Sequence, residues 1–409
     1  MAFLALAHVS ILHSTSIFGY DTRSLRSALV MRTVDALNPF KRAQPFHWRT
    51  PVVVSSAAGL GDLFIHLPLL GGIVNTCRER GLEITVALRP DHLEIGRRLG
   101  WDVFPFDNGL EDFFKNPAAM HVFEFAGPTR KLREKRPALW IDLTGNAVSA
   151  IAIKIRGAKR LAARITRGGK SLVDHPLPHF IQENEYENRL RVASHLGCAL
   201  DFSLSEKMNR SSPAGLCESI VLCLTTASRW KNWPLANFRR LIERFPESQF
   251  TVIGFAREIL PEDLPELDRI VHLPNVVNRV NQLTTIEMVD LIVKCRAVVT
   301  NDTSAAHIAN FFGKPGAVLF GPVSPHTFAT PEGLRVFHDA TCPYHPCVQW
   351  RCSNKANWCM RKISASEVAD YLETLLGRPD TMESVGLTTH PAHDPAQQPD
   401  WQRKAQLPV

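Results

Sequence analysis

Three short polar segments of this chain carry residues able to bind and activate a phosphorylated substrate. The first is Gly59-Leu60-Gly61-Asp62, a turn between a valine-rich segment and an apolar stretch of helical length. Glycine lets a ligand approach the backbone closely, and the N-terminus of a helix favours negative charge. Asp62 has two interpretations, because a carboxylate at this position either caps the helix dipole or acts as a general base.

The second segment is Arg229-Trp230-Lys231-Asn232-Trp233-Pro234, which follows an apolar run that ends at Leu224. Proline is favoured in the first turn of a helix, so Lys231 is expected just before a helix N-terminus, where it can meet a phosphate. An ordinary solvated lysine is the alternative. Thr225 and Thr226 lie in the same loop and are candidate hydroxyl donors to a ligand.

The third segment, Asn301-Asp302-Thr303-Ser304, lies between a predicted strand and a short helix over 305–312. A helix that begins with small residues presents free backbone N–H groups to a diphosphate. We expect Thr303 and Ser304 at this turn to contact such a group. Asp302 is either a helix cap or a ligand for sugar hydroxyls. His307 is either a core histidine or a further residue that binds the same ligand.

Four cysteines lie close together in the sequence with the spacing C-x4-C-x4-C-x6-C: Cys342, Cys347, Cys352 and Cys359. Four thiols within such a segment are able to hold a structural zinc or iron ion, although the spacing is wider than that of common zinc knuckles. Free thiols and disulfides are the alternatives. The other five cysteines are scattered through the chain, mostly within apolar segments, a usage that suits a reducing compartment.

Alternating strands and helices must position these segments. Apolar runs predict strands over 51–56, 83–88, 101–106, 139–143, 220–224, 250–253, 270–273, 297–300 and 317–320. Helical periodicity follows several of them, and this alternation indicates parallel sheets covered by helices on both faces. The polar stretch 205–215 is the best linker candidate. We therefore predict two facing domains, 49–205 and 216–376, with ligands bound between them at the carboxyl ends of the strands.

Composition limits the function classes. Of the 409 residues, 45% are hydrophobic and 21% charged, which excludes wholesale disorder. No run of 18 apolar residues occurs, so we expect no membrane-spanning helix. Lysine and arginine exceed aspartate and glutamate by 7, which favours an anionic partner. The basic residues are dispersed and no nucleic-acid-binding module is recognisable, so we expect no nucleic-acid partner.

The two ends of the chain fall outside the predicted domains. Residues 1–48 form an extension whose helix, over about 22–37, is either packed on the main domain or a basic amphipathic surface for a membrane or another subunit. No basic residue precedes the apolar N-terminal stretch, so we expect no secretory signal and a cytoplasmic location. The polar tail 378–409 is predicted to be disordered.

The chain resembles glycosyltransferase family 9, the group typified by ADP-heptose:lipopolysaccharide heptosyltransferases. The matching segments follow the family's order and spacing over about residues 51–376. They are 61–62 with 67–68, 141–146, 157–160, Lys231-Asn232-Trp233-Pro234, 301–307, Gly313-Lys314-Pro315, 319–322 and the cysteine-rich stretch 342–359. The extension 1–48 and the tail lie outside the resemblance.

The resemblance implies a GT-B fold, in which two Rossmann-like domains face each other across a cleft, and an inverting sugar transfer from a nucleotide diphosphate. Asp62 matches the catalytic base, with Gly61 beside it. Lys231 matches a lysine that contacts the donor phosphate and sugar, and residues 302–304 match the turn that holds the donor. No Asp-x-Asp pair occurs, which argues against a metal-bridged diphosphate, and no cofactor is expected for catalysis. Some related proteins bind iron.

We therefore expect an enzyme that moves a heptose from ADP-heptose to a lipopolysaccharide core or a related glycan. Its partners would be the nucleotide-sugar donor and an anionic glycolipid or glycan acceptor, reached by peripheral association with the inner face of the cytoplasmic membrane. Two alternatives stay open. One is the same chemistry on a protein hydroxyl or a different surface glycan, and the other is a non-catalytic protein that binds sugar nucleotides.

Overall fold

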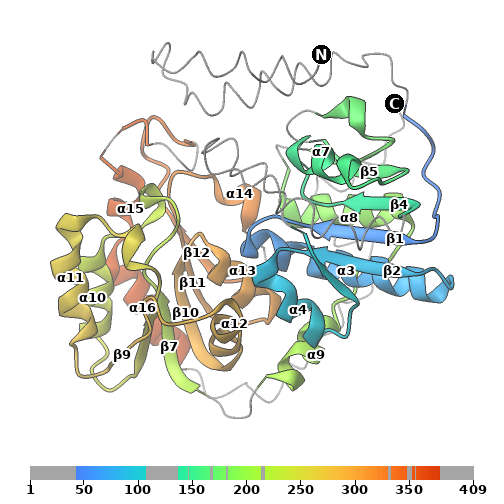
Figure 1. Ribbon diagram of the computed structural model, residues 1–409. Coiled ribbons are helices and arrows are strands. Elements are labelled where there is room, and N and C mark those ends of the chain that lie inside the picture. The colour runs from blue at the N-terminus through green and yellow to red at the C-terminus, as the bar shows by residue number, and fades with distance from the viewer. Residues whose placement is uncertain are drawn as a thin grey trace, which may run out of the picture.

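The computed structural model describes residues 43–106, 137–145, 147–165, 169–180, 183–212, 217–329, 333–347, 352–354 and 356–377. The predicted N-terminal helix and the predicted disordered tail lie outside the described residues, so both remain predictions. Within the described part, the chain folds around two parallel sheets of six strands each (Figure 1).

The first sheet is built from the N-terminal half of the chain. Its strands are β1 (Val52–Ser56), β2 (Ile84–Leu88), β3 (Val103–Pro105), β4 (Leu139–Asp142), β5 (Leu161–Arg164) and β6 (His175–Leu177). Its helices are α3 (Leu60–Glu79), α4 (Leu93–Arg98), α7 (Ala147–Ile155), α8 (Glu185–Leu196) and α9 (Leu204–Ser211). Every residue of β1 and β4 is buried, as expected for central strands with helices on both faces.

The second sheet is built from the C-terminal half. Its strands are β7 (Cys217–Cys223), β8 (Phe250–Ile253), β9 (Val276–Asn278), β10 (Cys295–Asn301), β11 (Gly316–Phe320) and β12 (Arg335–His338). Its helices are α10 (Leu235–Glu243), α11 (Leu264–Val271), α12 (Thr285–Lys294), α13 (Ser304–Phe311), α14 (Pro325–Phe328), α15 (Trp358–Lys362) and α16 (Ala365–Leu376). These elements enclose a core that includes Trp233, Phe238 and Phe250.

The two sheets have the same topology. The strand orders are β3-β2-β1-β4-β5-β6 and β12-β11-β10-β7-β8-β9, so each half reads 3-2-1-4-5-6 when its own strands are numbered from one. The order reverses beside β1 in the first sheet and between β7 and β10 in the second. Ligands of such sheets bind where the order reverses, at the carboxyl ends of the strands. The predicted GT-B architecture of two Rossmann-like domains is confirmed.

Helices α3 and α13 lie at the boundary between the halves (Figure 1) and pack against each other. Phe64 of α3 makes an edge-on contact with Phe311 of α13, with ring centroids 5.4 Å apart. Away from this contact, Arg98 of α4 donates two hydrogen bonds to Asp290 of α12, at 2.5 and 2.9 Å. Apolar packing and an ion pair therefore both hold the two halves together.

Most predicted strands are present, but the strand expected over 270–273 is wrong. Ile270 and Val271 end helix α11, and strand β9 begins at Val276. The apolar residues of this segment recur at helical spacing, and Ile270 is the residue of α11 that is buried. The short strands β5, β6 and β12 were not predicted.

The predicted linker 205–215 is also shorter than expected. Leu204 and Met208 lie one turn apart and are buried, so residues 204–211 form α9, which packs against α3. We therefore propose that the N-terminal domain, predicted to end at 205, continues through α9. The C-terminal boundary of 216–376 stays as predicted.

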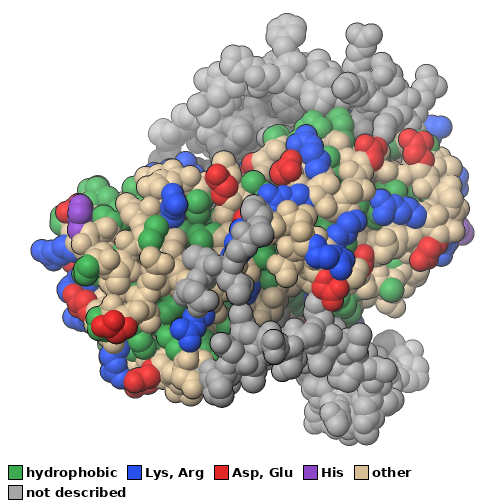
Figure 2. Space-filling view, turned by 90° about the horizontal axis from the view of Figure 1, so that it is seen from below, with side chains coloured by type: hydrophobic (Ala, Val, Ile, Leu, Met, Phe, Trp, Pro, Cys, Tyr) green, Lys and Arg blue, Asp and Glu red, His purple; other side chains and the backbone are tan. Residues whose placement is uncertain are grey.

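One helix in the described part of the chain, α3, is long and apolar enough to cross a membrane by length and composition. Its apolar stretch is 78% buried inside the protein, which is typical of a core helix. On the face shown in Figure 2, basic and acidic side chains are interspersed, so the surplus of 7 positive charges does not form a single patch on the visible part of that face.

Candidate active site at the domain boundary

Asp62 lies in the first turn of α3, which follows β1 at the point where the strand order reverses. Gly59 occupies the N-cap position and supplies no side chain to cap the helix. Burial raises the pKa of Asp62 above its usual value, and the charges of Arg164 and Lys231 and a hydrogen bond from the Gly59 backbone act in the opposite direction. A carboxylate whose basicity is raised above that of a free aspartate suits a general base.

Lys231 and Asp302 form an ion pair on the other side of the boundary. The Lys231 Nζ atom lies 2.7 Å from Asp302 Oδ2, and the two side chains are only 12% and 4% exposed. Lys231 ends the short 3₁₀ helix η5 (Arg229–Lys231), which follows β7, and Asp302 follows β10. The charges of both residues act on Asp62, so the structure brings the three predicted residues into one site.

Asn301 fixes the relative position of the two C-terminal loops. Its Nδ2 donates to the backbone oxygens of Cys223 and Leu224, at the end of β7, while its Oδ1 accepts from the Trp233 amide at 2.9 Å. The Trp233 ring nitrogen in turn donates to Ile363 O at 3.0 Å. Because these bonds join the ends of β7 and β10, Lys231 and Asp302 are held on a rigid support.

The N-terminus of α13 is open for an anion. Thr303 is its N-cap residue, adopts an extended backbone conformation and makes no side-chain cap hydrogen bond. Helices leave their first N–H groups without partners inside the helix, and these groups favour negative charge. Thr303 and Ser304 remain partly exposed, whereas Ala305 and Ala306 behind them are buried. This is the placement that the sequence predicts for a diphosphate-binding turn.

His307 lies against the opposite domain. Its Nδ1 atom is 3.0 Å from the Tyr186 hydroxyl of α8, and burial lowers the pKa of His307 to about 4, so the ring is neutral at pH 7. A Cβ atom placed on Gly61 would lie 2.7 Å from His307 Cδ2 and 3.4 Å from Ser304 Cα. Glycine at position 61 therefore lets the start of α3 approach the start of α13.

Replacing Gly61 with alanine is expected to lower kcat/KM by about 10- to 100-fold, because the added methyl group pushes α3 from α13 and misplaces Asp62. Gly59→Ala is the matched control in the same turn. Its Cβ would meet only Asp62 Oδ2, at an ordinary 3.5 Å, and its φ of −61° suits alanine. Steady-state kinetics of the two variants test the contact, and equal activities would show that it is not needed.

Thr225 and Thr226 are placed differently from Lys231. The Thr225 hydroxyl donates to Glu258 Oε2 at 2.7 Å, and the Thr226 hydroxyl donates to Ser228 O at 2.7 Å. Both side chains are buried. Their hydroxyl protons are thus used within the protein, and the predicted contacts with a donor would require these bonds to be exchanged. In this structure the two threonines brace the loop that carries Lys231.

Two charged residues near Asp62, Arg164 and Glu185, were not predicted as site residues from the sequence. Arg164 ends β5 and is 8% exposed, and its Nη2 donates to Glu185 Oε2 of α8 at 3.1 Å. The signal was available, because a single arginine closes the buried run Leu161-Ala162-Ala163, and a charge at the carboxyl end of a strand lies at the ligand-binding edge. It was overlooked because β5 itself was not predicted.

The four cysteines of the cluster lie near one another, since the charges of Cys342, Cys347 and Cys352 all act on Cys359. Among the described residues, which include all four cysteines, no three Cys, His, Asp or Glu side chains are placed to hold one metal ion. The Cys347 thiol instead donates to Tyr344 O at 3.2 Å, and Asn354 donates to Cys342 Sγ at 3.6 Å. None of the four forms a disulfide, and burial raises the pKa of Cys359 to about 11. The metal site and the free-thiol alternative therefore both stay predictions.

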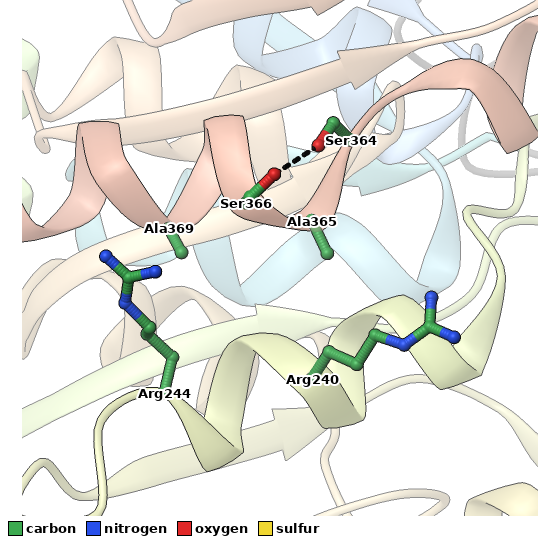
Figure 3. A pocket seen from close by; sticks show the side chains of 6 residues that line it. All are labelled: Arg240, Arg244, Ser364, Ala365, Ser366 and Ala369. Carbon is green, nitrogen blue, oxygen red and sulfur yellow. Dashed lines mark hydrogen bonds between the residues drawn. The ribbon is translucent and has the colours of Figure 1, made fainter.

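A surface hollow of about 320 Å³ lies between α10 and α16 (Figure 3). It is lined by Arg240, Arg244, Ser364, Ala365, Ser366 and Ala369. The Arg244 guanidinium is already bonded to Asp370 and Glu373, at 3.0 and 2.9 Å. The hollow contains none of the residues around Asp62, and we assign it no part in the site.

Comparison with known protein sequences identifies relatives over part of the chain. Residues 193–362 match the family model described as glycosyltransferase family 9 (heptosyltransferase). Lipooligosaccharide heptosyltransferase 2 of Haemophilus influenzae is 34% identical over 106 residues, which cover 23% of this chain and 28% of that protein. The Haemophilus ducreyi protein of the same description is 34% identical over 101 residues, which cover 23% and 29%. The match thus spans less than a third of each curated relative.

Comparison with solved structures covers both domains. The Escherichia coli heptosyltransferase WaaC with ADP-2-deoxy-2-fluoro heptose superposes with a TM-score of 0.61 at 17% identity, covering 79% of this chain and 99% of that one. The E. coli ADP-heptose lps heptosyltransferase II gives a TM-score of 0.58 at 18% identity, covering 80% and 98%. At these identities the likeness establishes the fold.

Proposed function

Because residues 193–362 match the model of glycosyltransferase family 9, we propose that the chain transfers a heptose from ADP-heptose to a hydroxyl of a lipopolysaccharide core or a related glycan, with inversion at the anomeric carbon. The observation that carries the proposal is the placement of Asp62. It faces the Lys231–Asp302 pair across the domain boundary, beside the open N-terminus of α13. A base on one domain and an anion-binding site on the other are what a single displacement requires.

The chemical step is a direct displacement. The acceptor oxygen bonds to the anomeric carbon as the bond from that carbon to the diphosphate oxygen breaks, and the acceptor proton passes to the Asp62 carboxylate. The leaving diphosphate takes the bonding electrons and gains negative charge. Lys231 and the backbone N–H groups at the start of α13 would meet that charge, and because they are already in place, they stabilise it without reorganisation.

The charges at the site support a base of adjustable strength. Two cations, Arg164 and Lys231, lie with three carboxylates, Asp62, Asp302 and Glu185. The five groups sum to −1 when all are ionised and to zero once Asp62 has accepted a proton. An arriving diphosphate adds negative charge and raises the pKa of Asp62 further, so donor binding would strengthen the base before the acceptor is deprotonated.

What the relatives are named for and were solved with guides the choice of donor and acceptor. WaaC was solved with an ADP-heptose analogue and also with ADP, which makes an ADP-linked heptose the donor that we propose. The curated relatives are named for lipooligosaccharide, which supports a phosphorylated glycolipid as acceptor. We propose that the protein works in the cytoplasm, associated peripherally with the inner face of the cytoplasmic membrane.

A panel of nucleotide sugars tests the donor. An ADP-linked heptose at about 100 times its Kd should stabilise the folded protein by about 2.7 kcal/mol, which raises Tm by several degrees for domains of this size. UDP- and GDP-linked sugars at equal concentrations are the controls. Stabilisation by UDP- or GDP-sugars without any effect of ADP-sugars would contradict the proposed donor. Product analysis by NMR would then report the anomeric configuration.

A further inference from the structure

Arg164 is a buried cation beside Asp62 to which the proposed reaction gives no direct role. Its Nη1 atom lies 3.0 Å from His66 Nε2. Asp62 and His66 are four residues apart on α3, so they lie on the same side of the helix. The Arg164 guanidinium therefore runs along the side of α3 that carries Asp62, and it exerts the largest effect of any neighbouring charge on that carboxyl.

The protein holds the guanidinium in a fixed orientation. Arginine only donates hydrogen bonds, so His66 Nε2 accepts from Arg164 and the His66 proton sits on Nδ1, which lies 3.1 Å from Ser56 Oγ. The second amino group donates to Glu185 Oε2 at 3.1 Å. Arg164 Nε is buried and has no hydrogen-bond partner among the described residues. Burying an unpartnered donor costs stability, and such costs are typical of functional sites.

Few of the side chains around Arg164 carry a charge at pH 7. Burial, together with the Arg164 charge, lowers the pKa of His66 well below its usual value. Burial lowers the pKa of His179, on the other side of Glu185, to about 4. Both rings are therefore neutral at pH 7, and Glu185 is the only anion bonded to Arg164 among the described residues.

The groups that face Asp62 from the C-terminal domain form a second, separate set. Lys231 from η5 and Asp302 from the end of β10 are paired with each other, and His307 of α13 is neutral at pH 7 because burial lowers its pKa to about 4. Of the two cations whose charges act on Asp62, Arg164 is thus the one that belongs to the same domain. It stays beside that residue whatever occupies the donor side.

We propose that Arg164 is a positioning residue for Asp62, held rigid by His66 and Glu185 so that its charge keeps the Asp62 carboxylate ionised and ready for the acceptor hydroxyl. This inference rests on the proposed role of Asp62 as base. Burial alone favours the neutral carboxyl group, which cannot accept a proton. A fixed opposite charge restores the ionised form without providing a proton of its own, since arginine does not deprotonate in proteins.

The pH dependence of kcat/KM tests the proposal with Arg164→Met. Loss of the cation should move the midpoint of the acidic limb upward by about one to two pH units. Activity would fall by about 5- to 50-fold at the wild-type midpoint and return to within about threefold at high pH, where Asp62 ionises unaided. Arg164→Lys keeps the charge but not the two-sided hydrogen bonding, so we expect a lower rate at all pH values with an unchanged midpoint.

Glu185→Gln supplies a test of opposite sign. Removing this anion leaves the Arg164 charge uncompensated, so the midpoint of the acidic limb should move downward. Arg164→Met and Glu185→Gln both break the same ion pair, and a merely loosened structure would shift both profiles in the same direction. Shifts in the same direction, or a uniform loss without any shift, would overturn the proposal.

A titration of Asp62 itself separates this inference from the proposed function. The ¹³Cγ resonance of Asp62, assigned by its disappearance in Asp62→Asn, reports the carboxyl pKa without any substrate. We expect a higher pKa in Arg164→Met and a lower one in Glu185→Gln than in the wild type. If no sugar is transferred from any donor but these shifts occur, the proposed function fails and the effect of Arg164 on Asp62 stands. Identical Asp62 titrations in all three proteins would refute it.

Discussion

Asp62→Asn should reduce kcat by about 10²- to 10⁴-fold, the usual contribution of a general base. The amide has nearly the shape of the carboxylate but cannot take the acceptor proton. In the wild type, activity should rise with pH through a midpoint above the ordinary aspartate value, because burial raises the pKa of Asp62 and only the ionised form accepts a proton. Single-turnover rates across a pH series would measure both effects.

A change of charge at Asp62 also affects folding, so the assay needs a separate measure of donor binding. The Asn variant should bind the nucleotide-sugar donor within about threefold of the wild type, since Lys231 and the start of α13 are unchanged. Thermal stabilisation by the donor checks this directly. Turnover within tenfold of the wild type in a variant that binds donor normally would remove Asp62 from the role of base.

The sequence was sufficient for the fold because the strongest signals are the central strands. The run Val52-Val53-Val54 and the segment 297–300 are buried on both faces, so their apolar character is continuous and easy to recognise. Edge strands such as β6 and β12 are short and partly exposed, and their residues do not form a continuous apolar run. The helix that ends at Val271 shows the reverse error, where a short apolar run was interpreted as a strand.

The candidate site was predictable in position but not in its electrostatics. Each predicted site segment follows a strand beside the reversal of strand order, so topology alone brings Asp62, Lys231 and Asp302 together. The partners of individual atoms depend on tertiary packing. Nothing local indicates that the Thr225 hydroxyl is bonded to Glu258, or that Arg164 lies along α3.

Lys231→Met should lower kcat by about 10²- to 10³-fold, comparable to the loss of one preorganised donor to a developing anion. The lysine is nearly buried, and its ammonium lies 2.7 Å from Asp302, which comes two residues before α13, so the substitution removes a cation paired at the start of that helix. Methionine preserves much of the side-chain length and apolar volume. Rapid-quench measurement of the chemical step would separate this effect from product release.

The same substitution leaves Asp302 buried without its partner, which should destabilise the fold by about 3–5 kcal/mol. A double variant, Lys231→Met with Asp302→Asn, removes the uncompensated charge and should recover most of that loss in chemical denaturation. Transfer should stay at the low level of the single variant, because the diphosphate still lacks its cation. Recovery of both stability and transfer in the double variant would mean that Lys231 serves only to neutralise Asp302, and the electrostatic role in the reaction would then belong to the N-terminus of α13 alone.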